Sequence, residues 1–147
     1  MEIEYMVEML DSKDTSEAFK ALQELEKISD DSDAIYPYMA KFIEMIKSDK
    51  YVIRVRGFRL FCKQAKWDDK NIIDKNMESA LNILYDEKPT AVRQSLAALL
   101  DLIPYKKNLL EIIKSKVDDI DPYMYKDTMH NLLKKDKEAV YKLMEEI

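Results

Sequence analysis

Residues 34–66 read AIYPYMAKFIEMIKSDKYVIRVRGFRLFCKQAK. Apolar residues recur every three or four positions in both halves of this stretch, which is the spacing of one face of an α-helix. They are Ile35, Met39, Phe42 and Ile46 in the first half, and Val55, Phe58, Phe61, Cys62 and Ala65 in the second. Only the polar tripeptide Ser48-Asp49-Lys50 separates the halves, and so short a connection forces two helices to lie antiparallel. The stretch therefore predicts a helical hairpin.

The same layout recurs along the rest of the chain. Every second predicted helix begins near an acid that is followed six or seven residues later by a base: Asp14 and Lys20, Asp49 and Arg56, Asp86 and Arg93, Asp119 and Lys126. The bases lie 36, 37 and 33 residues apart, and repetition at such a period is typical of stacked helical repeats. No segment alternates polar and apolar residues as a strand does. We therefore expect an all-α fold.

Short polar breaks divide the chain into nine predicted helices within a single domain of residues 1–147. Asp14 and Glu17 form a capping-box pattern at one helix start, and Pro89 suits the first turn of another. Gly57, the only glycine, predicts a close helix crossing because it has no Cβ. The predicted helical pairs cover about 1–29, 33–66, 70–103 and 106–134, and a capping helix covers 137–146.

Two copies of this unit carry a family resemblance. Tyr36-Pro37 through Ile46, with Asp49 and Val55-Arg56, resembles the HEAT repeat, and a second copy is formed by Leu84, Asp86, Pro89 and Val92-Arg93. The resemblance covers nearly the whole chain and implies a right-handed α-solenoid of about four helical pairs plus the capping helix. It also implies that one helix of each pair lines a concave side, here 14–29, 51–66, 89–103 and 122–134. The first and fourth copies depart from the Val-Arg pattern, as terminal repeats commonly do.

A further resemblance rests on short motifs at the predicted helix ends. Ala65-Lys66-Trp67-Asp68, Asp86-Glu87-Lys88-Pro89 and Arg93-Gln94 are similar to small bacterial HEAT-like proteins. Some of those proteins are labelled after iron-sulfur cluster assembly scaffold proteins. This resemblance implies an accessory role in cluster assembly.

The composition argues against several kinds of chemistry. A single glycine leaves no Gly-rich phosphate loop, so a nucleotide-binding α/β fold is not expected. The only thiol, Cys62, has no internal disulfide partner, and the only imidazole, His130, lies nearly two repeats away, which argues against Cys-His catalysis. No Cys or His pair has the spacing of zinc ligands. We expect no enzymatic activity, no cofactor and no metal site.

The hydropathy pattern predicts a cytoplasmic protein with no membrane partner. The longest apolar runs are only a few residues, far shorter than a membrane-spanning helix requires. The first residues, Met1-Glu2-Ile3-Glu4, are acidic where a secretory signal peptide is basic.

The predicted helix 51–66 is the strongest candidate for a binding surface, because it contains five bases and no acid. Residues 1–33 carry a net charge of −8, whereas residues 34–70 carry +5. At about 100° per residue, four of the bases fall within an arc of roughly 80°. They are Arg56, Arg59, Lys63 and Lys66, which we call the basic stripe. Like charges on one rigid face sum their potential and suit an acidic peptide or phosphates.

Two interpretations of the basic stripe remain open. In the first, the stripe contacts a partner, with Trp67 or Arg93 at its margin. In the second, the acidic first repeat neutralises the stripe through Glu17, Glu24 and Glu26. Trp67 likewise either anchors a partner or packs between helices.

We expect a non-enzymatic protein-protein interaction or scaffold module whose partner is an acidic protein or peptide. The alternative is nucleic-acid binding, because the HEAT-like DNA glycosylases that act on alkylated bases use a basic concave groove. The oligomeric state also has two possibilities. An apolar edge in the last helix would favour a weak homodimer, and packing of that edge onto the preceding helix would favour a monomer; its residues are Ala139, Val140, Leu143, Met144 and Ile147.

Overall fold

The computed structural model describes residues 2–147, and within that range it contains α-helices and 3-10 turns but no strand. The all-α prediction is therefore confirmed for this part of the chain. The α-helices are α1 (Ile3–Met9), α2 (Thr15–Asp31), α3 (Met39–Ile46), α4 (Tyr51–Lys63), α5 (Ile72–Ala80), α6 (Pro89–Leu102), α7 (Leu110–Asp118) and α8 (Asp127–Glu146). The 3-10 turns are η1 (Tyr36–Tyr38), η2 (Ala65–Trp67), η3 (Leu81–Tyr85), η4 (Ile103–Tyr105), η5 (Lys107–Leu109) and η6 (Pro122–Met124).

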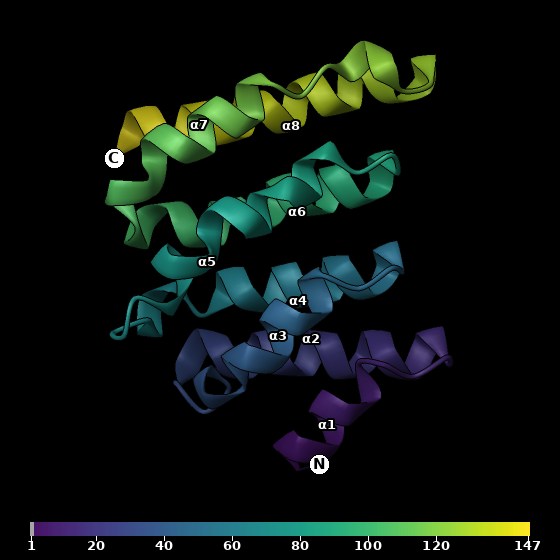
Figure 1. Cartoon of the computed structure of the whole chain (residues 1–147), viewed down its shortest axis with the longest axis vertical. Coiled ribbons are helices and arrows are strands. Elements are labelled where there is room, and N and C mark those ends of the chain that lie inside the picture. The colour runs from purple at the N-terminus through teal and green to yellow at the C-terminus, as the bar shows by residue number, and fades with distance from the viewer. Residues whose placement is uncertain (1) are drawn as a thin grey trace.

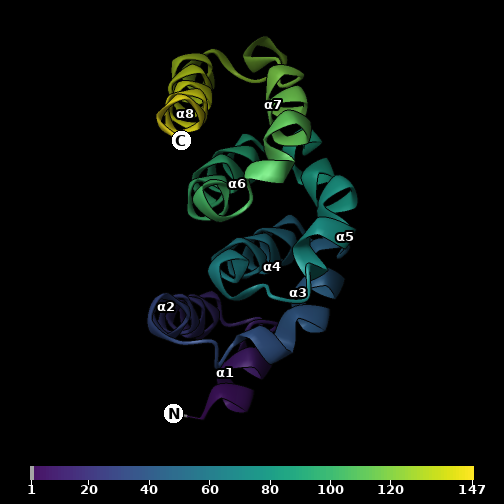
Figure 2. The ribbon, with the colours of Figure 1, turned by 90° about the vertical axis from the view of Figure 1, so that its left-hand side faces the viewer.

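The helices form two layers stacked in chain order from the N-terminus to the C-terminus (Figure 1). Viewed from the side, α2, α4, α6 and α8 follow one another in one layer, and α1, α3, α5 and α7 form the other (Figure 2). The stack bends so that the layer of α2, α4, α6 and α8 lies on the inner side of the curve (Figure 2). Because α4 packs against both α2 and α6, its side chains can reach the two neighbouring helices of its own layer. We call the surface of α2, α4 and α6 on that side the inner face.

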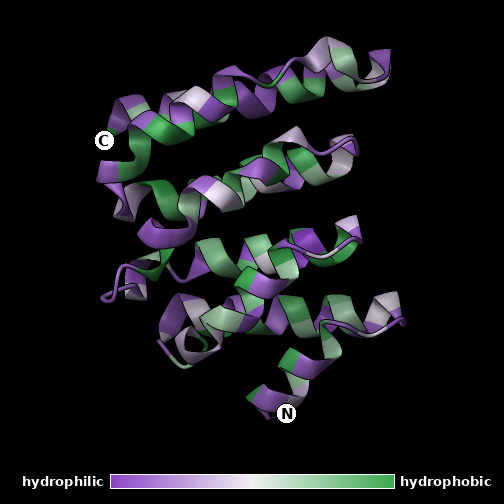
Figure 3. Cartoon of the chain, in the orientation of Figure 1, coloured by the Kyte–Doolittle hydropathy of each residue, from purple (hydrophilic) through white to green (hydrophobic). Residues whose placement is uncertain are grey.

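A continuous apolar core runs between the two layers. Each helix contributes to it from one side only, which is why hydrophobic and hydrophilic residues are interleaved along the helices (Figure 3). Phe42, Phe58 and Phe61 are fully buried at its centre. Gly57 lies where α4 crosses α3: a Cβ built on it would lie 2.6 Å from the Met45 Cβ and 2.8 Å from the Phe42 carbonyl oxygen. The close crossing predicted at Gly57 is confirmed, because no larger residue fits without a shift of α3.

Several predicted boundaries differ from the observed ones. Residues 2–147 contain eight α-helices instead of nine, because no break separates the segments predicted at 122–134 and 137–146: one continuous helix, α8, runs from Asp127 to Glu146. No glycine or proline separates them, and Leu133 and Val140 lie seven residues apart on one buried stripe. The predicted helix 51–66 ends as an α-helix at Lys63 and continues as the 3-10 turn η2. The helix start predicted at Asp14 is confirmed, since the Glu17 N–H donates to Asp14 Oδ1 at 3.2 Å. The reciprocal half of the capping box is not formed, because the Asp14 N–H donates to Ser12 Oγ at 3.1 Å.

A buried ion cluster ties three consecutive units together on the side of α5. Lys106 is 5% exposed, and its Nζ lies 3.0 Å from Asp68 Oδ2 and 2.6 Å from Asp74 Oδ1. Asp68 also accepts a hydrogen bond from the Tyr36 hydroxyl at 2.6 Å and from the backbone N–H groups of Ile72 and Ile73, each at 2.9 Å. Asp68 thus caps α5 while it joins Tyr36, before α3, to Lys106, before α7.

The C-terminal helix packs most of its apolar side chains inward. Val140 is fully buried, and Leu143 and Met144 pack against the core, whereas Ala139 is exposed and Ile147 is 37% exposed. Little of the apolar edge considered for homodimerisation is therefore exposed. None of the helices in residues 2–147 has the length and hydrophobicity needed to cross a lipid bilayer.

Candidate functional site

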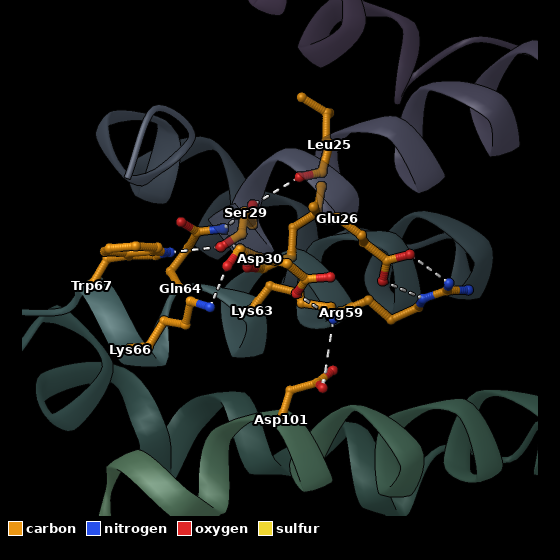
Figure 4. Close-up of polar contacts among 11 residues, drawn as sticks. Leu25, Glu26, Ser29, Asp30, Arg59, Lys63, Gln64, Lys66, Trp67 and Asp101 are labelled. Carbon is orange, nitrogen blue, oxygen red and sulfur yellow. Dashed lines mark hydrogen bonds and ion pairs between the residues drawn. The ribbon is translucent and has the colours of Figure 1, made fainter. Parts of the chain in front are cut away.

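Arg59 is the central polar residue of the inner face. It points from α4 toward α2, where its Nε donates to Glu26 Oε2 at 3.0 Å and its NH2 donates to Glu26 Oε1 at 2.8 Å (Figure 4). Its NH1 donates in the opposite direction to Gln94 Oε1 on α6 at 3.1 Å. One guanidinium therefore links three consecutive helices of the inner layer, and the planar fork matches the carboxylate geometry of Glu26.

Lys63 lies one turn further along α4 and links the same three helices. Its Nζ donates to Asp30 Oδ1 on α2 at 2.9 Å and lies 3.6 Å from Asp101 Oδ1 on α6 (Figure 4). Burial lowers the pKa of Lys63, but the hydrogen bond that Lys63 donates to Asp30 and the charges of Asp101, Asp30 and Glu26 outweigh burial and raise the pKa above its ordinary value. Lys63 is thus held in its charged form between two carboxylates.

Lys66 and Trp67 lie at the end of α4, against the end of α2. The Lys66 Nζ donates to the Asp30 carbonyl oxygen and lies 5.1 Å from the centre of the Trp67 ring. The Trp67 Nε1 donates to the Ser29 carbonyl oxygen at 2.7 Å (Figure 4). Trp67 is half-buried in this corner, and its contacts are those of packing between helices, one of the two interpretations left open for it.

Gln64 and Ser29 form a buried polar contact beneath this corner. The Gln64 Nε2 donates to Ser29 Oγ at 2.9 Å, and Ser29 Oγ donates to the Leu25 carbonyl oxygen at 2.8 Å (Figure 4). Both side chains are fully buried. Because a buried polar group must find its partner to avoid a desolvation penalty, this contact fixes the register of α4 against α2. Neither residue was singled out by the sequence pattern.

The remaining arginines lie apart from Arg59 and Lys63. Arg93 pairs with Asp136 on α8, with Nε 2.7 Å from Asp136 Oδ2. Arg54, which falls outside the basic stripe, pairs with Asp86 at 2.6 Å. Arg56 is only 8% exposed and donates from NH1 to the Leu10 carbonyl oxygen at 2.8 Å, just after α1. The structure therefore does not present Arg56, Arg59, Lys63 and Lys66 as one open cationic surface.

Internal neutralisation, one of the two interpretations of the basic stripe, describes the observed contacts of Arg59 and Lys63. Of the three acids proposed for it, Glu26 makes its ion pair, whereas Glu17 and Glu24 make none among the residues described. Asp30 and Asp101 take the other positions. The sequence places Asp30 at a helix end and Asp101 two repeats away from α2, so helix periodicity alone did not indicate that both would meet Lys63.

An open depression of about 600 Å³ remains in the inner face above these ion pairs. We call it the trough. Phe19 on α2 stands at its side with 46% of its surface exposed, and Ala97 and Ala98 of α6 form part of the opposite side. Its full lining is Phe19, Glu26, Arg59, Lys63, Gln94, Ala97, Ala98 and Asp101. The trough thus combines an exposed aromatic ring with charged groups that already have partners.

A smaller pocket of about 170 Å³ adjoins the trough and shares Phe19, Arg59 and Gln94 with it. We call it the Arg56 pocket. Its other lining residues are Thr15, Leu22, Tyr51, Val52, Val55 and Arg56. Val52 is 39% exposed, so the two exposed apolar side chains of this region, Phe19 and Val52, belong to the same pocket.

The two residues considered for nucleophilic catalysis lie on different helices. Cys62 is fully buried in α4, and burial raises the pKa of its thiol well above the ordinary value, which keeps it protonated at neutral pH. The His130 Nε2 lies 2.8 Å from the Tyr125 carbonyl oxygen, and its ring packs edge-on against Tyr123. Within residues 2–147, no three His, Cys, Asp or Glu side chains are grouped to hold a metal ion.

In three comparisons with known proteins, no family model, no curated protein and no solved structure matches the chain.

Proposed function

We propose that the chain is an α-solenoid of HEAT type that acts as a non-enzymatic protein-binding module, with the trough as its docking surface. The observation that carries this proposal is the exposed Phe19 ring beside a depression lined on its other side by Ala97 and Ala98. A large exposed aromatic ring next to small side chains offers apolar area and room for a partner side chain.

The ion pairs beneath the trough support this function by fixing its shape. Arg59 and Lys63 hold α2, α4 and α6 at set positions, so the surface is formed before a partner arrives. A preformed surface loses little conformational freedom on binding, which favours affinity. The partner we propose is a segment of an acidic protein, because Arg56, which lines the pocket beside the trough, has no carboxylate partner among the residues described.

The proposal is tested by panning random peptides displayed on phage against the folded protein. Two variants alter the trough: Phe19→Ser removes the exposed ring, and Ala97→Glu fills the opposite side. Tyr105→Ser is the matched control, because Tyr105 is 54% exposed and is not part of the trough lining. We expect the selected peptides to lose binding to both trough variants and to keep it with the control.

Two results would count against the proposal. A selection that yields no peptide at all would do so, as would peptides that bind the trough variants and the wild-type protein equally. Nucleic-acid binding and a role in iron-sulfur cluster assembly have weaker physical support: the Arg59 and Lys63 charges have internal partners, and the single thiol is buried.

A further inference from the structure

Arg56 differs from the other three arginines of the chain in having no carboxylate partner among the residues described. Arg54 pairs with Asp86, Arg59 with Glu26 and Arg93 with Asp136, in each case at 2.8 Å or less. Arg56 is the most buried of the four, and its NH1 donates to the Leu10 carbonyl oxygen. A guanidinium has five N–H donors, so most of those of Arg56 are left without a protein partner among the residues described.

A buried cation without a counter-ion is unusual, because removing charge from water costs free energy that an ion pair normally offsets. Burial lowers the pKa of Arg56 below its ordinary value, and the charge of Asp11 opposes that shift without forming an ion pair with it. Asp11 is engaged elsewhere, in an ion pair with Lys41.

The other acids of the neighbouring elements also have partners or lie outside the pocket. Asp14 accepts from the Glu17 N–H at the start of α2, and Glu26 is held by Arg59. Glu17 is exposed and does not line the Arg56 pocket. None of these carboxylates is placed to neutralise Arg56.

The Arg56 pocket has the size and walls for a short acidic side chain with an apolar neighbour. A water molecule occupies about 30 Å³ of liquid, so a cavity of about 170 Å³ holds several waters or one side chain. Arg56 and Thr15 supply hydrogen-bond donors, while Phe19 and Val52 supply exposed apolar surface at the same pocket. Charge and apolar area therefore lie side by side.

We propose that the Arg56 pocket receives an aspartate or glutamate side chain from a partner protein, and that an aromatic or branched apolar residue next to it covers Phe19 and Val52. This inference rests on the proposed function, because it names the chemistry by which a docked segment is recognised. The carboxylate accepts hydrogen bonds from the guanidinium and completes the missing ion pair.

The test uses the phage-displayed random peptides selected on the wild-type protein. We expect them to share an Asp or Glu beside an apolar residue. Changing that acid to its amide should weaken binding to the wild-type protein by about 10- to 100-fold, the loss typical of a charge-assisted hydrogen bond. This change is made in the peptide, so it leaves the fold of the protein intact.

Variants of the protein complete the test. Against Arg56→Met the acidic peptide and its amide should bind equally. Lys20→Met is the matched control, since it removes an exposed positive charge of α2 that does not line the pocket, and it should preserve the preference for the acid.

The outcomes separate this inference from the proposed function. Peptides that need Phe19 and Ala97 but bind equally as acid and amide would overturn the inference and leave the trough as a docking surface. If no peptide depends on the trough, both proposals fail. Sedimentation tests whether the pocket binds a second copy of this chain. If the wild-type protein self-associates and Arg56→Met does not, the pocket receives a second copy, and the assignment to another protein is overturned.

Discussion

Arg59 and Glu26 form a two-point ion pair between α4 and α2, although 33 residues separate them in the chain. Both side chains are partly shielded from water, with 23% and 15% of their surfaces exposed. The pair therefore lies between the exposed class, which contributes little to stability, and the fully buried class, which carries a large desolvation cost. The two hydrogen bonds from Arg59 to Glu26 hold the basic helix α4 against α2, which lies in the acidic segment of residues 1–33.

The Arg59–Glu26 pair is expected to couple α2 to α4. In a double-mutant cycle with Arg59→Met and Glu26→Gln, we expect a coupling energy of about 1–2 kcal/mol, because both hydrogen bonds are charge-assisted. Urea unfolding of the wild-type protein, the two single variants and the double variant measures it. The coupling should decrease as salt is added. Strict additivity of the two single changes would show that the pair does not stabilise the stack.

Gly57 provides a test of the α3–α4 crossing. Gly57→Ala should lower the free energy of unfolding by about 1–3 kcal/mol, because the added methyl group meets the Met45 Cβ and the Phe42 carbonyl. The direction of the change in unfolding free energy distinguishes a close crossing from an open position, since glycine to alanine at an open helix position stabilises by about 1 kcal/mol. Asn131→Ala, at an exposed site of α8, serves as the control and should be neutral or slightly stabilising. A stabilised Gly57→Ala protein would contradict the close crossing.

The Lys106 cluster should make the protein sensitive to acid. Burial raises the pKa values of Asp68 and Asp74, but hydrogen bonds outweigh it and hold both below their ordinary values: Tyr36 and Lys106 donate to Asp68, and Lys106 and Asn108 donate to Asp74. An acid whose pKa is lowered on folding stabilises the protein above its unfolded pKa and loses that effect as pH falls through the folded pKa. Stability should therefore fall as the pH drops below about 4.

The contribution of Asp74 to this acid sensitivity can be isolated. Urea midpoints of Asp74→Asn should change less over that pH range than those of the wild-type protein, because one of the carboxylates that must be protonated has been removed. Asp31→Asn, at the exposed end of α2, is the control and should follow the wild-type curve. Parallel curves for the wild-type and Asp74→Asn proteins would show that Asp74 does not contribute.

Tyr36 should make the stabilising effect of the same cluster depend on pH in the alkaline range. Burial, and then the hydrogen bond and charge of Asp68, raise the pKa of Tyr36 to about 12 from an ordinary value of 10.0. Its stabilising effect is complete below the unfolded pKa and is lost as pH rises through the folded pKa. Tyr36→Phe should cost about 2 kcal/mol at neutral pH, and its deficit relative to the wild-type protein should shrink between about pH 10 and pH 12. Urea unfolding across this range measures it, and a constant deficit would contradict the link to ionisation.

Local sequence signals predicted the parts of the fold that depend on one helix at a time. Apolar periodicity located the helices, and the absence of a Cβ at Gly57 indicated the close crossing. The break predicted before residue 137 was wrong, because Lys135 and Asp136 are polar residues on a continuous helix and carry no helix-breaking geometry. Polarity alone does not end a helix when one side faces water.

Contacts between helices far apart in the sequence were harder to predict, because they depend on how far each helix slides along its neighbour. Glu26 was identified as a partner for the basic stripe, since it lies in the acidic segment of residues 1–33. The partner of Arg54, which falls outside the basic stripe, was not identified: it is Asp86, which lies 32 residues away. The burial of Lys106 between Asp68 and Asp74 gave no sequence signal, because a lysine near a helix end is usually solvated.

The internal ion pairs also predict how the protein should behave toward nucleic acid. Wild-type protein should bind duplex DNA weakly, because carboxylates from α2 and α6 occupy Arg59 and Lys63. The triple variant Glu26→Gln/Asp30→Asn/Asp101→Asn removes those carboxylates while keeping the size of each side chain. It should bind more tightly, and its affinity should fall by about 0.9 log unit per log unit of salt for each phosphate contacted. Fluorescence anisotropy of labelled duplex at two salt concentrations measures both effects.

The control variant removes the same net charge from exposed acids at the N-terminus and in α1, and it should leave DNA binding weak; it is Glu2→Gln/Glu4→Gln/Glu8→Gln. Equal gains in both variants would show that net charge, and not release of the basic stripe, controls binding. Tight, salt-sensitive binding by the wild-type protein would instead favour the nucleic-acid alternative over the protein-binding module.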